Sequence, residues 1–250
     1  MCLLALAWSH HPRWRLVLAG NRDEFHARPT SALSIWPDAP GVAAGRDLRS
    51  GGSWAGIGPG GRMAVVTNVR DPLATQAGPS RGALVADYLR GTQPAAARID
   101  QLESAAHAYA PFNLLLADRS GVEYLGNHPA ERQTLGAGIH GMSNGALDAP
   151  WPKTLGLMEA LAAWIDAGKA ELEPLWSALA DEQRPRDEDL PDTGIGLERE
   201  RWLSPAFIRG DDYGTRASTI ILIDQAGHGE IHERRFGPQG AFTGESHVSF

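Results

Sequence analysis

The sequence predicts an α+β protein built as a four-layer αββα sandwich, with two stacked antiparallel sheets covered by helices on their outer faces. Three observations predict this architecture. Short apolar runs come in pairs joined by turns, stretches with helical spacing also come in pairs, and no strand–helix–strand alternation is present. Runs of strands that alternate with runs of helices indicate antiparallel sheets with segregated helices. Strands that are apolar on both faces need a cover on each side, which four layers provide.

The composition limits the class of protein. At 250 residues, 42% hydrophobic and 21% charged, with no linker or internal repeat, the chain predicts a single domain over residues 1–250. A formal net charge of −7 argues against nucleic acid as a partner. No apolar run reaches 18 residues, so no stable membrane insertion is expected. A lone cysteine and the lack of a signal peptide favour a cytoplasmic location, and the oligomeric state stays undefined.

The N-terminal part predicts a strand pair followed by a long loop. Residues 2–8 and 14–20 are apolar runs separated by a polar turn at 9–13, as in two strands of a hairpin. Residues 25–50 are rich in Pro, Gly, Asp and Arg and show no period. We therefore expect an ordered loop over 25–50, and a loop of this length is typical of one that covers a site.

A second hairpin follows at residues 53–58 and 62–69. Its Gly56, Gly58 and Gly61 match the dinucleotide pattern G-x-G-x-x-G. That pattern needs a preceding strand and a following helix, whereas these glycines sit in a hairpin turn. We therefore expect no nucleotide cofactor.

The rest of the chain alternates helix pairs with strands. Apolar residues recur at helical spacing in residues 81–90, 94–109, 151–166 and 170–180. Strands are expected at residues 112–118, 122–126, 139–143, 215–224 and 230–236, with an edge strand at 241–248. Residues 181–199 are charged and contain proline without an apolar period, which predicts a surface loop.

The first candidate for chemistry is the N-terminus itself. Cys2 is the only cysteine and directly follows Met1. Removal of Met1 would place a free α-amine, with a reference pKa of about 7.7–8.0, beside a thiol of about 8.5. This pair supplies a nucleophile and a general base within one residue. The alternative is that Cys2 is a small apolar residue at the start of a buried strand.

The second candidate is the polar run Asn21-Arg22-Asp23-Glu24, which directly follows an apolar strand. Polar groups at the end of a buried strand need partners or a pocket. If the first two strands pair, Arg22 or Asp23 lies beside Cys2, where a cation favours the thiolate and a carboxylate holds the α-amine. Neighbouring strand residues point to opposite faces, so both cannot face Cys2 unless the strand has ended or bulged. The alternative is a solvated strand end.

Three further polar residues, Asn68, Asn144 and Arg216, also lie where apolar strands end or begin. Each has a simpler explanation: Asn144 precedes a glycine, as in a turn, Asn68 suits a bond to its own loop, and Arg216 suits an ion pair with Asp211 or Asp212. The histidines show no metal-ligand spacing with a second cluster, and no G-x-S-x-G nucleophile elbow exists. No metal and no cofactor are therefore expected.

Seven motifs taken together resemble one family. They are Cys2 after Met1, Asn21-Arg22-Asp23-Glu24, Gly51-Gly52-Ser53-Trp54-Ala55-Gly56, Thr67-Asn68, Pro111-Phe112-Asn113-Leu114, Ser143-Asn144-Gly145 and Tyr213-Gly214-Thr215-Arg216. The set covers nearly the whole chain and resembles the NRDE family, the family of transport and Golgi organisation protein 2. That family is similar in layout to N-terminal nucleophile hydrolases of the cholylglycine hydrolase and penicillin V acylase type.

The resemblance to these acylases implies roles for the candidate residues. Cys2 would be the nucleophile, with its freed amine as proton acceptor. Asp23 would orient the amine or thiol, and Arg22 would support the thiolate. In the acylases the matching Arg and Asp lie a few positions apart, whereas here they are adjacent. Asn68 and Asn144 would donate to the developing oxyanion, each donor contributing about 2.7–4 kcal/mol.

The implied reaction is hydrolysis of a linear C–N amide of a small acyl compound through a thioester acyl-enzyme. Arg216 would fix Asp23 or contact that acyl-enzyme. Family members have also been linked to haem handling, so the alternative is a non-enzymatic binding or trafficking protein for a hydrophobic ligand such as haem. The expected partner is therefore a small-molecule amide or a hydrophobic ligand.

Overall fold

The computed structural model of the protein describes residues 3–75, 77–168 and 170–249. Within these residues one antiparallel sheet has six strands in the order β10-β1-β2-β11-β12-β13. Their bounds are β1 (Leu3–Trp8), β2 (Trp14–Phe25), β10 (Gly138–Met142), β11 (Tyr213–Asp224), β12 (Gly229–Phe236) and β13 (Phe242–Ser249).

The second antiparallel sheet has seven strands among the described residues, in sequence order from β3 to β9. Their bounds are β3 (Thr30–Trp36), β4 (Ala39–Asp47), β5 (Ala55–Gly58), β6 (Arg62–Asn68), β7 (Phe112–Ala117), β8 (Val122–Asn127) and β9 (Ala130–Thr134).

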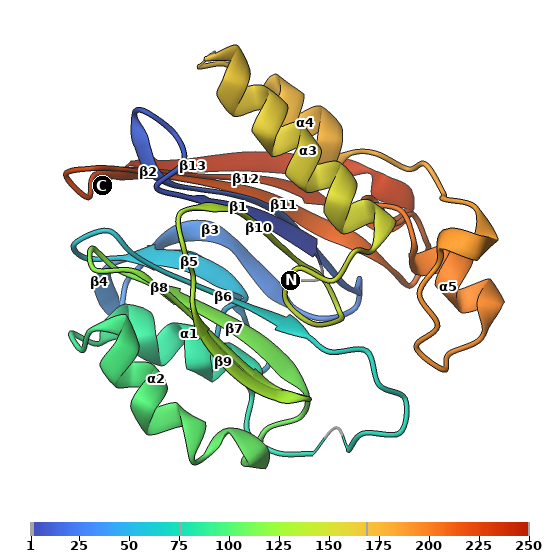
Figure 1. The fold of residues 1–250 in the computed structure, drawn as a ribbon, viewed down its shortest axis with the longest axis horizontal. Coiled ribbons are helices and arrows are strands. Elements are labelled where there is room, and N and C mark those ends of the chain that lie inside the picture. Colours follow the sequence, from blue (N-terminus) through green and yellow to red (C-terminus); the bar gives the residue numbers. More distant parts are fainter. Residues whose placement is uncertain (1–2, 76, 169, 250) are drawn as a thin grey trace.

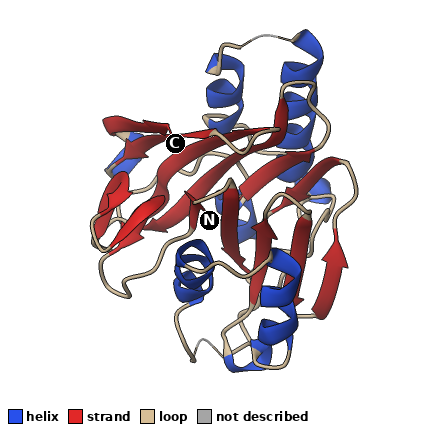
Figure 2. Ribbon diagram, turned by 90° about the vertical axis from the view of Figure 1, so that its left-hand side faces the viewer, coloured by secondary structure: helices blue, strands red, loops and turns tan. Residues whose placement is uncertain are grey.

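Two helix pairs cover the outer faces of the stacked sheets, which gives the four layers that Figures 1 and 2 show. One pair, α3 (Pro152–Ala167) and α4 (Glu173–Leu179), packs on the six-stranded sheet. The other, α1 (Arg81–Arg90) and α2 (Ala95–Glu103), packs on the seven-stranded sheet. The predicted αββα sandwich is therefore confirmed.

The alternation of side chains along β1 shows why its sequence is apolar throughout. Leu4 and Leu6 join the core between the two sheets, whereas Leu3 and Ala5 join the core beneath α3 and α4. Successive strand residues point to opposite faces, and both faces of this strand are covered. All six residues of β1 are consequently buried.

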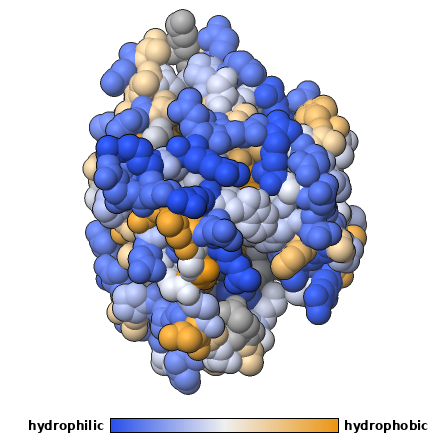
Figure 3. Space-filling view, turned by 90° about the vertical axis from the view of Figure 1, so that its right-hand side faces the viewer, coloured by the Kyte–Doolittle hydropathy of each residue, from blue (hydrophilic) through white to orange (hydrophobic). Residues whose placement is uncertain are grey.

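The remaining helix, α5 (Leu197–Leu203), lies beside the sandwich (Figure 1). The face of the molecule on that side is mainly hydrophilic, with hydrophobic side chains in small separate groups (Figure 3). No helix in the described parts of the chain is long and apolar enough to cross a membrane.

The predicted loop over residues 25–50 is wrong, because β3 and β4 lie within it and pair with each other. β3 is the edge of the seven-stranded sheet, and its register shifts twice, so its sequence shows no regular alternation. The opposite edge strand, β9, was not predicted either, since all five of its residues are exposed. Residues 181–199 are likewise not wholly loop, as α5 begins at Leu197.

Candidate functional site

The polar run of residues 21–24 lies inside β2, which continues to Phe25. The side chains alternate between two environments. Arg22 faces the other sheet, where its guanidinium lies 4.5 Å from the ring centroid of Trp54 and 3.6 Å from Glu24. Asn21 and Asp23 face the layer of α3 and α4. Arg22 and Asp23 therefore lie on opposite faces of the strand, as alternation requires.

Asn21 holds the strand to the segments that cover it. Its amide nitrogen donates to the main-chain oxygens of Leu179 (2.7 Å) and Ala206 (2.8 Å). Its side-chain oxygen accepts a hydrogen bond of 2.6 Å from the hydroxyl of Ser218. These three bonds satisfy a fully buried amide, so Asn21 acts as a structural residue.

Asp23 is the buried carboxylate of the site. The hydroxyl of Thr215 donates to it over 2.7 Å and accepts from the main-chain nitrogen of Ile208 over 2.9 Å. Burial raises the pKa of the Asp23 carboxyl, and the positive charge of Lys153 and the Thr215 bond oppose that rise only in part. A buried carboxyl with a raised pKa is typical of functional sites.

A β-bulge in β11 decides which residue meets Asp23. Thr215 pairs with Asp23, and Ala217 already pairs with Arg22, so Arg216 is the extra residue. The Arg216 guanidinium donates to the main-chain oxygens of Arg28 and Phe25. The structure therefore places Arg216 away from Asp23 and puts Thr215 beside it.

Asn68, the last residue of β6, meets Asn144, which lies in the bend after β10. The amide nitrogen of Asn144 donates to the main-chain oxygen of Asn68 over 2.8 Å. The main-chain oxygen of Asn144 accepts from the nitrogen of Arg70 over 2.7 Å. Asn144 is nearly buried and Asn68 is exposed. The structure therefore brings these two asparagines together.

Two pockets meet at this site. The first, of about 490 Å³, lies between the end of β2, residues 47–54 and the start of α1. It is polar, and its charged lining residues are Arg22, Arg28, Arg49, Arg81, Asp23, Glu24 and Asp47. The second, of about 270 Å³, carries an apolar wall of Ile195, Leu203, Ile208 and Tyr213.

Asp23 and Asn68 line both pockets, so they mark the junction between them. Asn144 lines the second pocket and Arg22 lines the first. Arg216 lines a different pocket, between Thr30 and Phe236. Four of the predicted residues therefore gather around one cleft, and Arg216 does not.

Cys2 lies outside the described residues. Leu3, to which it is covalently joined, is the first described residue of β1 and pairs with Asn21. Arg22 and Asp23 are therefore the residues of β2 that follow the partner of Leu3, the first described residue of β1.

Two features of the site were not singled out from the sequence. Thr215 belongs to the motif Tyr213-Gly214-Thr215-Arg216, but residue type does not show which member of that motif meets Asp23. The bulge at Arg216 decides it, and the bulge is visible only in the structure. Lys153, the second residue of α3, carries a positive charge that partly opposes the rise in the pKa of Asp23. It lies far from Asp23 in the sequence, and no motif links the two residues.

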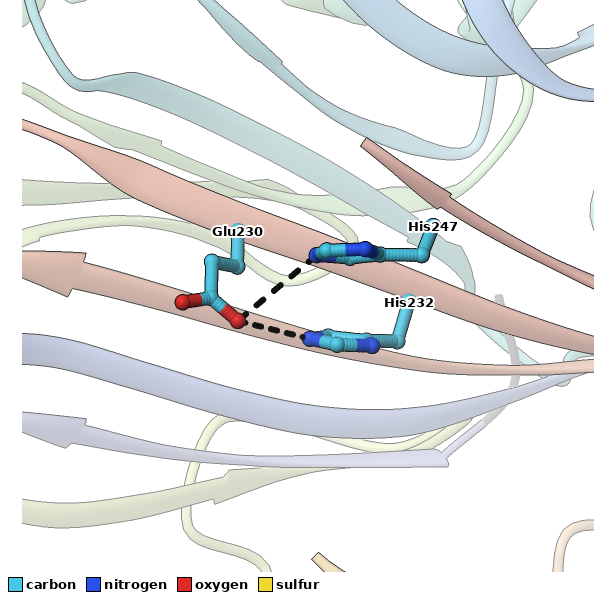
Figure 4. A group of neighbouring side chains, drawn as sticks. All are labelled: Glu230, His232 and His247. Carbon is cyan, nitrogen blue, oxygen red and sulfur yellow. Dashed lines mark hydrogen bonds and ion pairs between the residues drawn. The ribbon is translucent and has the colours of Figure 1, made fainter. Parts of the chain in front are cut away.

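A second cluster of polar side chains lies on β12 and β13, where Glu230, His232 and His247 gather (Figure 4). The sequence predicted no metal-ligand spacing among the histidines. The cluster exists because the antiparallel pairing of the two strands places His247 directly opposite His232. Such pairing is visible only once the strand register is known.

Comparison with known proteins identifies relatives of the whole chain. A family model described as Transport and Golgi organisation 2 matches residues 1–238. A Transport and Golgi organization protein 2 homolog from Bos taurus is 31% identical over 260 residues, covering 94% of this chain and 92% of that protein.

Two solved structures align with the chain at low sequence identity. A Caenorhabditis elegans N-acylethanolamine-hydrolyzing acid amidase (NAAA) ortholog aligns with a TM-score of 0.52 and 10% identity, over 90% of this chain and 93% of that one. Penicillin V acylase from Agrobacterium tumefaciens aligns with a TM-score of 0.48 and 13% identity, over 94% and 83%. The likeness to the amidase shows a common fold, and the family match is what identifies the protein. The chain belongs to the Transport and Golgi organisation 2 family.

Proposed function

We propose that the protein is an N-terminal cysteine amidohydrolase that cleaves a linear C–N amide of a small acyl compound through a thioester acyl-enzyme. One observation carries this proposal. The buried carboxyl of Asp23, held by Thr215, lies at the junction of two pockets of different polarity, next to the described start of β1.

The nucleophile of the proposed reaction is Cys2, which one peptide bond joins to Leu3. Leu3 pairs with Asn21, and Asp23 follows two residues along β2. Consecutive Cα atoms lie about 3.8 Å apart, so an N-terminal thiol and amine are within reach of this part of β2. After loss of Met1, the α-amine would take the proton of the thiol, and the thiolate would attack the carbonyl carbon of the amide. The C–N bond would then break as the α-ammonium returns the proton to the leaving amine, and water would hydrolyse the resulting thioester to release the acid and restore the thiol.

Asp23 would pair with the protonated α-amine. Burial makes the ionised form of the Asp23 carboxyl costly, and its raised pKa reflects that cost. A protonated α-amine beside it would offset that penalty and would fix the orientation of the N-terminus. Thr215 would in turn fix the carboxylate, because its hydroxyl is anchored on the main chain at Ile208.

Asn144 supports the oxyanion step. Its amide nitrogen carries two hydrogens, and the main-chain oxygen of Asn68 accepts one of them. The other is available to a carbonyl oxygen bound in the second pocket, which Asn144 lines. Fixed donors of this kind stabilise the developing charge, and each contributes about 2.7–4 kcal/mol.

The two pockets favour a substrate with two different ends. The apolar wall of the second pocket suits the acyl chain, and the arginines of the first suit a polar or anionic amine portion. The scissile amide would then lie at the junction beside Asp23 and Asn68. N-acylated amino acids with acyl chains of graded length have this chemistry.

The test begins with the intact mass of the untagged protein before and after reaction with iodoacetamide. The expected result is a mass that lacks one methionine and a single fast alkylation. The protein is then screened against N-acylated amino acids. Turnover should disappear in Cys2→Ala and fall by at least about a hundredfold in Asp23→Asn. The matched control is Asp166→Asn, an exposed carboxylate on α3 that should leave turnover unchanged.

Unchanged turnover in Cys2→Ala would refute the proposal. Retained Met1 with an unreactive thiol and no turnover would do the same, and a saturable haem titration of that protein would then support the non-catalytic alternative. The described lining of the two pockets contains no histidine or methionine, so Tyr213 is the described side chain able to bind haem iron there.

A further inference from the structure

We propose that Glu230, His232 and His247 form a binding site for a divalent transition-metal ion of the zinc class. The site lies on the six-stranded sheet, where β12 pairs with the edge strand β13 (Figure 4). It is separate from the cleft around Asp23, since none of the three residues lines either of its pockets.

The backbone places the three side chains on one face of the sheet. Glu230 and His232 are two residues apart in β12, so both point the same way. His247 pairs directly with His232 across the strands, and Ser249 pairs with Glu230. The three side chains therefore form a compact group from two neighbouring strands, as Figure 4 shows.

The distances between the donor atoms fit one shared ion. Glu230 Oε2 lies 3.1 Å from His232 Nε2 and 3.6 Å from His247 Nε2. Ligand atoms at about 2.0–2.1 Å from a tetrahedral zinc ion lie roughly 3.3–3.4 Å apart. All three donor atoms lie within 4.8 Å of one another, so small side-chain shifts complete the geometry.

The donor set selects the class of ion. Two imidazoles and one carboxylate suit zinc and similar transition metals, whereas calcium and magnesium prefer oxygen ligands alone. Three protein ligands leave the fourth position to water.

Ion binding requires one local rearrangement. The rings of His232 and His247 are stacked, with centroids 4.2 Å apart and planes 16° from parallel, so their nitrogen lone pairs do not yet converge. His247 Nε2 also lies 3.2 Å from the hydroxyl of Ser249. The His247 side chain is about half exposed, on an edge strand, so its ring has room to tilt toward Glu230.

One arginine on the same face has its positive charge offset by two carboxylates. Arg234 follows His232 by two residues, and its guanidinium pairs with Glu173 (3.2 Å) and Glu245 (3.7 Å). It also stacks on Trp176 at 4.6 Å from the ring centroid. A bound ion would join β12 to the edge strand β13 through side chains and so hold β13 against the sheet.

The test uses untagged full-length protein carrying Cys2→Ala, because an N-terminal thiol and amine would bind zinc themselves. The protein is freed of metal with a chelator and titrated calorimetrically with Zn²⁺ alone. We expect one equivalent to bind and the Tm to rise with zinc concentration. His247→Ala and Glu230→Gln should each weaken binding by at least about tenfold.

The matched control is His228→Ala, since the His228 side chain is 78% exposed and lies in the turn before β12. It should bind zinc as the parent does. The visible spectrum of bound Co²⁺ gives a second readout that reports coordination directly. Absence of saturable binding in the parent, or equal affinity in His247→Ala and the parent, would overturn the proposal.

Discussion

The hydroxyl of Thr215 donates a 2.7 Å hydrogen bond to the carboxylate of Asp23, across the pairing of β11 with β2. The same oxygen accepts a bond from the main chain of Ile208, which lies outside the sheet in the wall of the second pocket. One hydroxyl therefore links the central strand of the site to the segment that encloses it.

Replacing Thr215 with valine keeps the shape and removes the hydroxyl. Asp23 would lose the bond from Thr215, and the main-chain nitrogen of Ile208 would lose the Thr215 acceptor. The loss of such buried hydrogen bonds should lower the free energy of unfolding by about 1–3 kcal/mol in urea denaturation at neutral pH. Thr215→Ser retains the hydroxyl and should lose much less. Equal losses in the two variants would show that packing, rather than the hydrogen bonds, sets the effect.

Asp23 should make the stability of the fold depend on pH. Its pKa in the folded protein is raised by burial above the unfolded value of about 3.9. The folded state therefore binds this proton more tightly than the unfolded state does. The stability that this tighter binding contributes is fully present below the unfolded pKa and is lost as pH rises through the folded pKa. Asp23→Asn removes this loss, so its stability relative to the parent should increase from about pH 4 to 7.

Urea unfolding of both proteins across this pH range measures that difference. Titration of the remaining groups cancels in the comparison. Asp166→Asn, at an exposed position, should give a difference that does not vary with pH. A relative stability of Asp23→Asn that is flat or falls with pH would contradict the assignment of Asp23 as a destabilised buried carboxylate.

Asn21→Ala should lower the free energy of unfolding far more than Asn68→Ala does. It removes two bonds to main-chain oxygens and one from Ser218, all three of them buried. We expect a loss of about 3 kcal/mol or more in the free energy of unfolding. Asn68→Ala, at an exposed side chain, should change it by less than about 0.5 kcal/mol. Similar values for the two would contradict the structural role of Asn21.

Gly45 should tolerate no side chain, because an added Cβ would overlap the outer edge of the Trp54 indole. That indole supports the guanidinium of Arg22. Gly45→Ala should therefore destabilise the protein by about 1–3 kcal/mol in urea denaturation. Gly156→Ala is the control, since its Cβ would enter open space within α3, and helix propensity predicts a gain of about 0.5–1 kcal/mol. An unaffected Gly45→Ala would mean that Trp54 can move freely.

The sequence was most informative where strands are covered on both faces. β1 is apolar on both sides, and the sequence predicts its bounds closely, as it does those of α1. The start of β2 is also predicted correctly, but the strand continues through the polar run to Phe25 rather than ending at residue 20. The sequence does not predict β3 and β9, because the register of β3 shifts twice and every residue of β9 is exposed, so neither strand shows an apolar alternation. The edge strand predicted at residues 241–248 is present as β13.

The same limit applies to the site. Alternation along a strand correctly separates Arg22 from Asp23, because it depends on sequence position alone. The contact of Thr215 with Asp23 depends on a bulge, and the meeting of His232 with His247 depends on register. Neither is contained in residue type or spacing. The nucleophilic role of Cys2 stays a prediction, since that residue lies outside those that the structure describes.

The alternation of residues 21–24 along β2 also sets what changes this strand can accept. A single substitution changes the side chain on only one face of β2. Insertion or deletion of a single residue upstream within β2 would exchange the two sides, turning Arg22 into the helix layer and Asp23 into the space between the sheets. The polar turn at residues 9–13 has no regular alternation of side chains that an insertion or deletion would disturb. Length variation among relatives should therefore be found in that turn and be absent from residues 14–24.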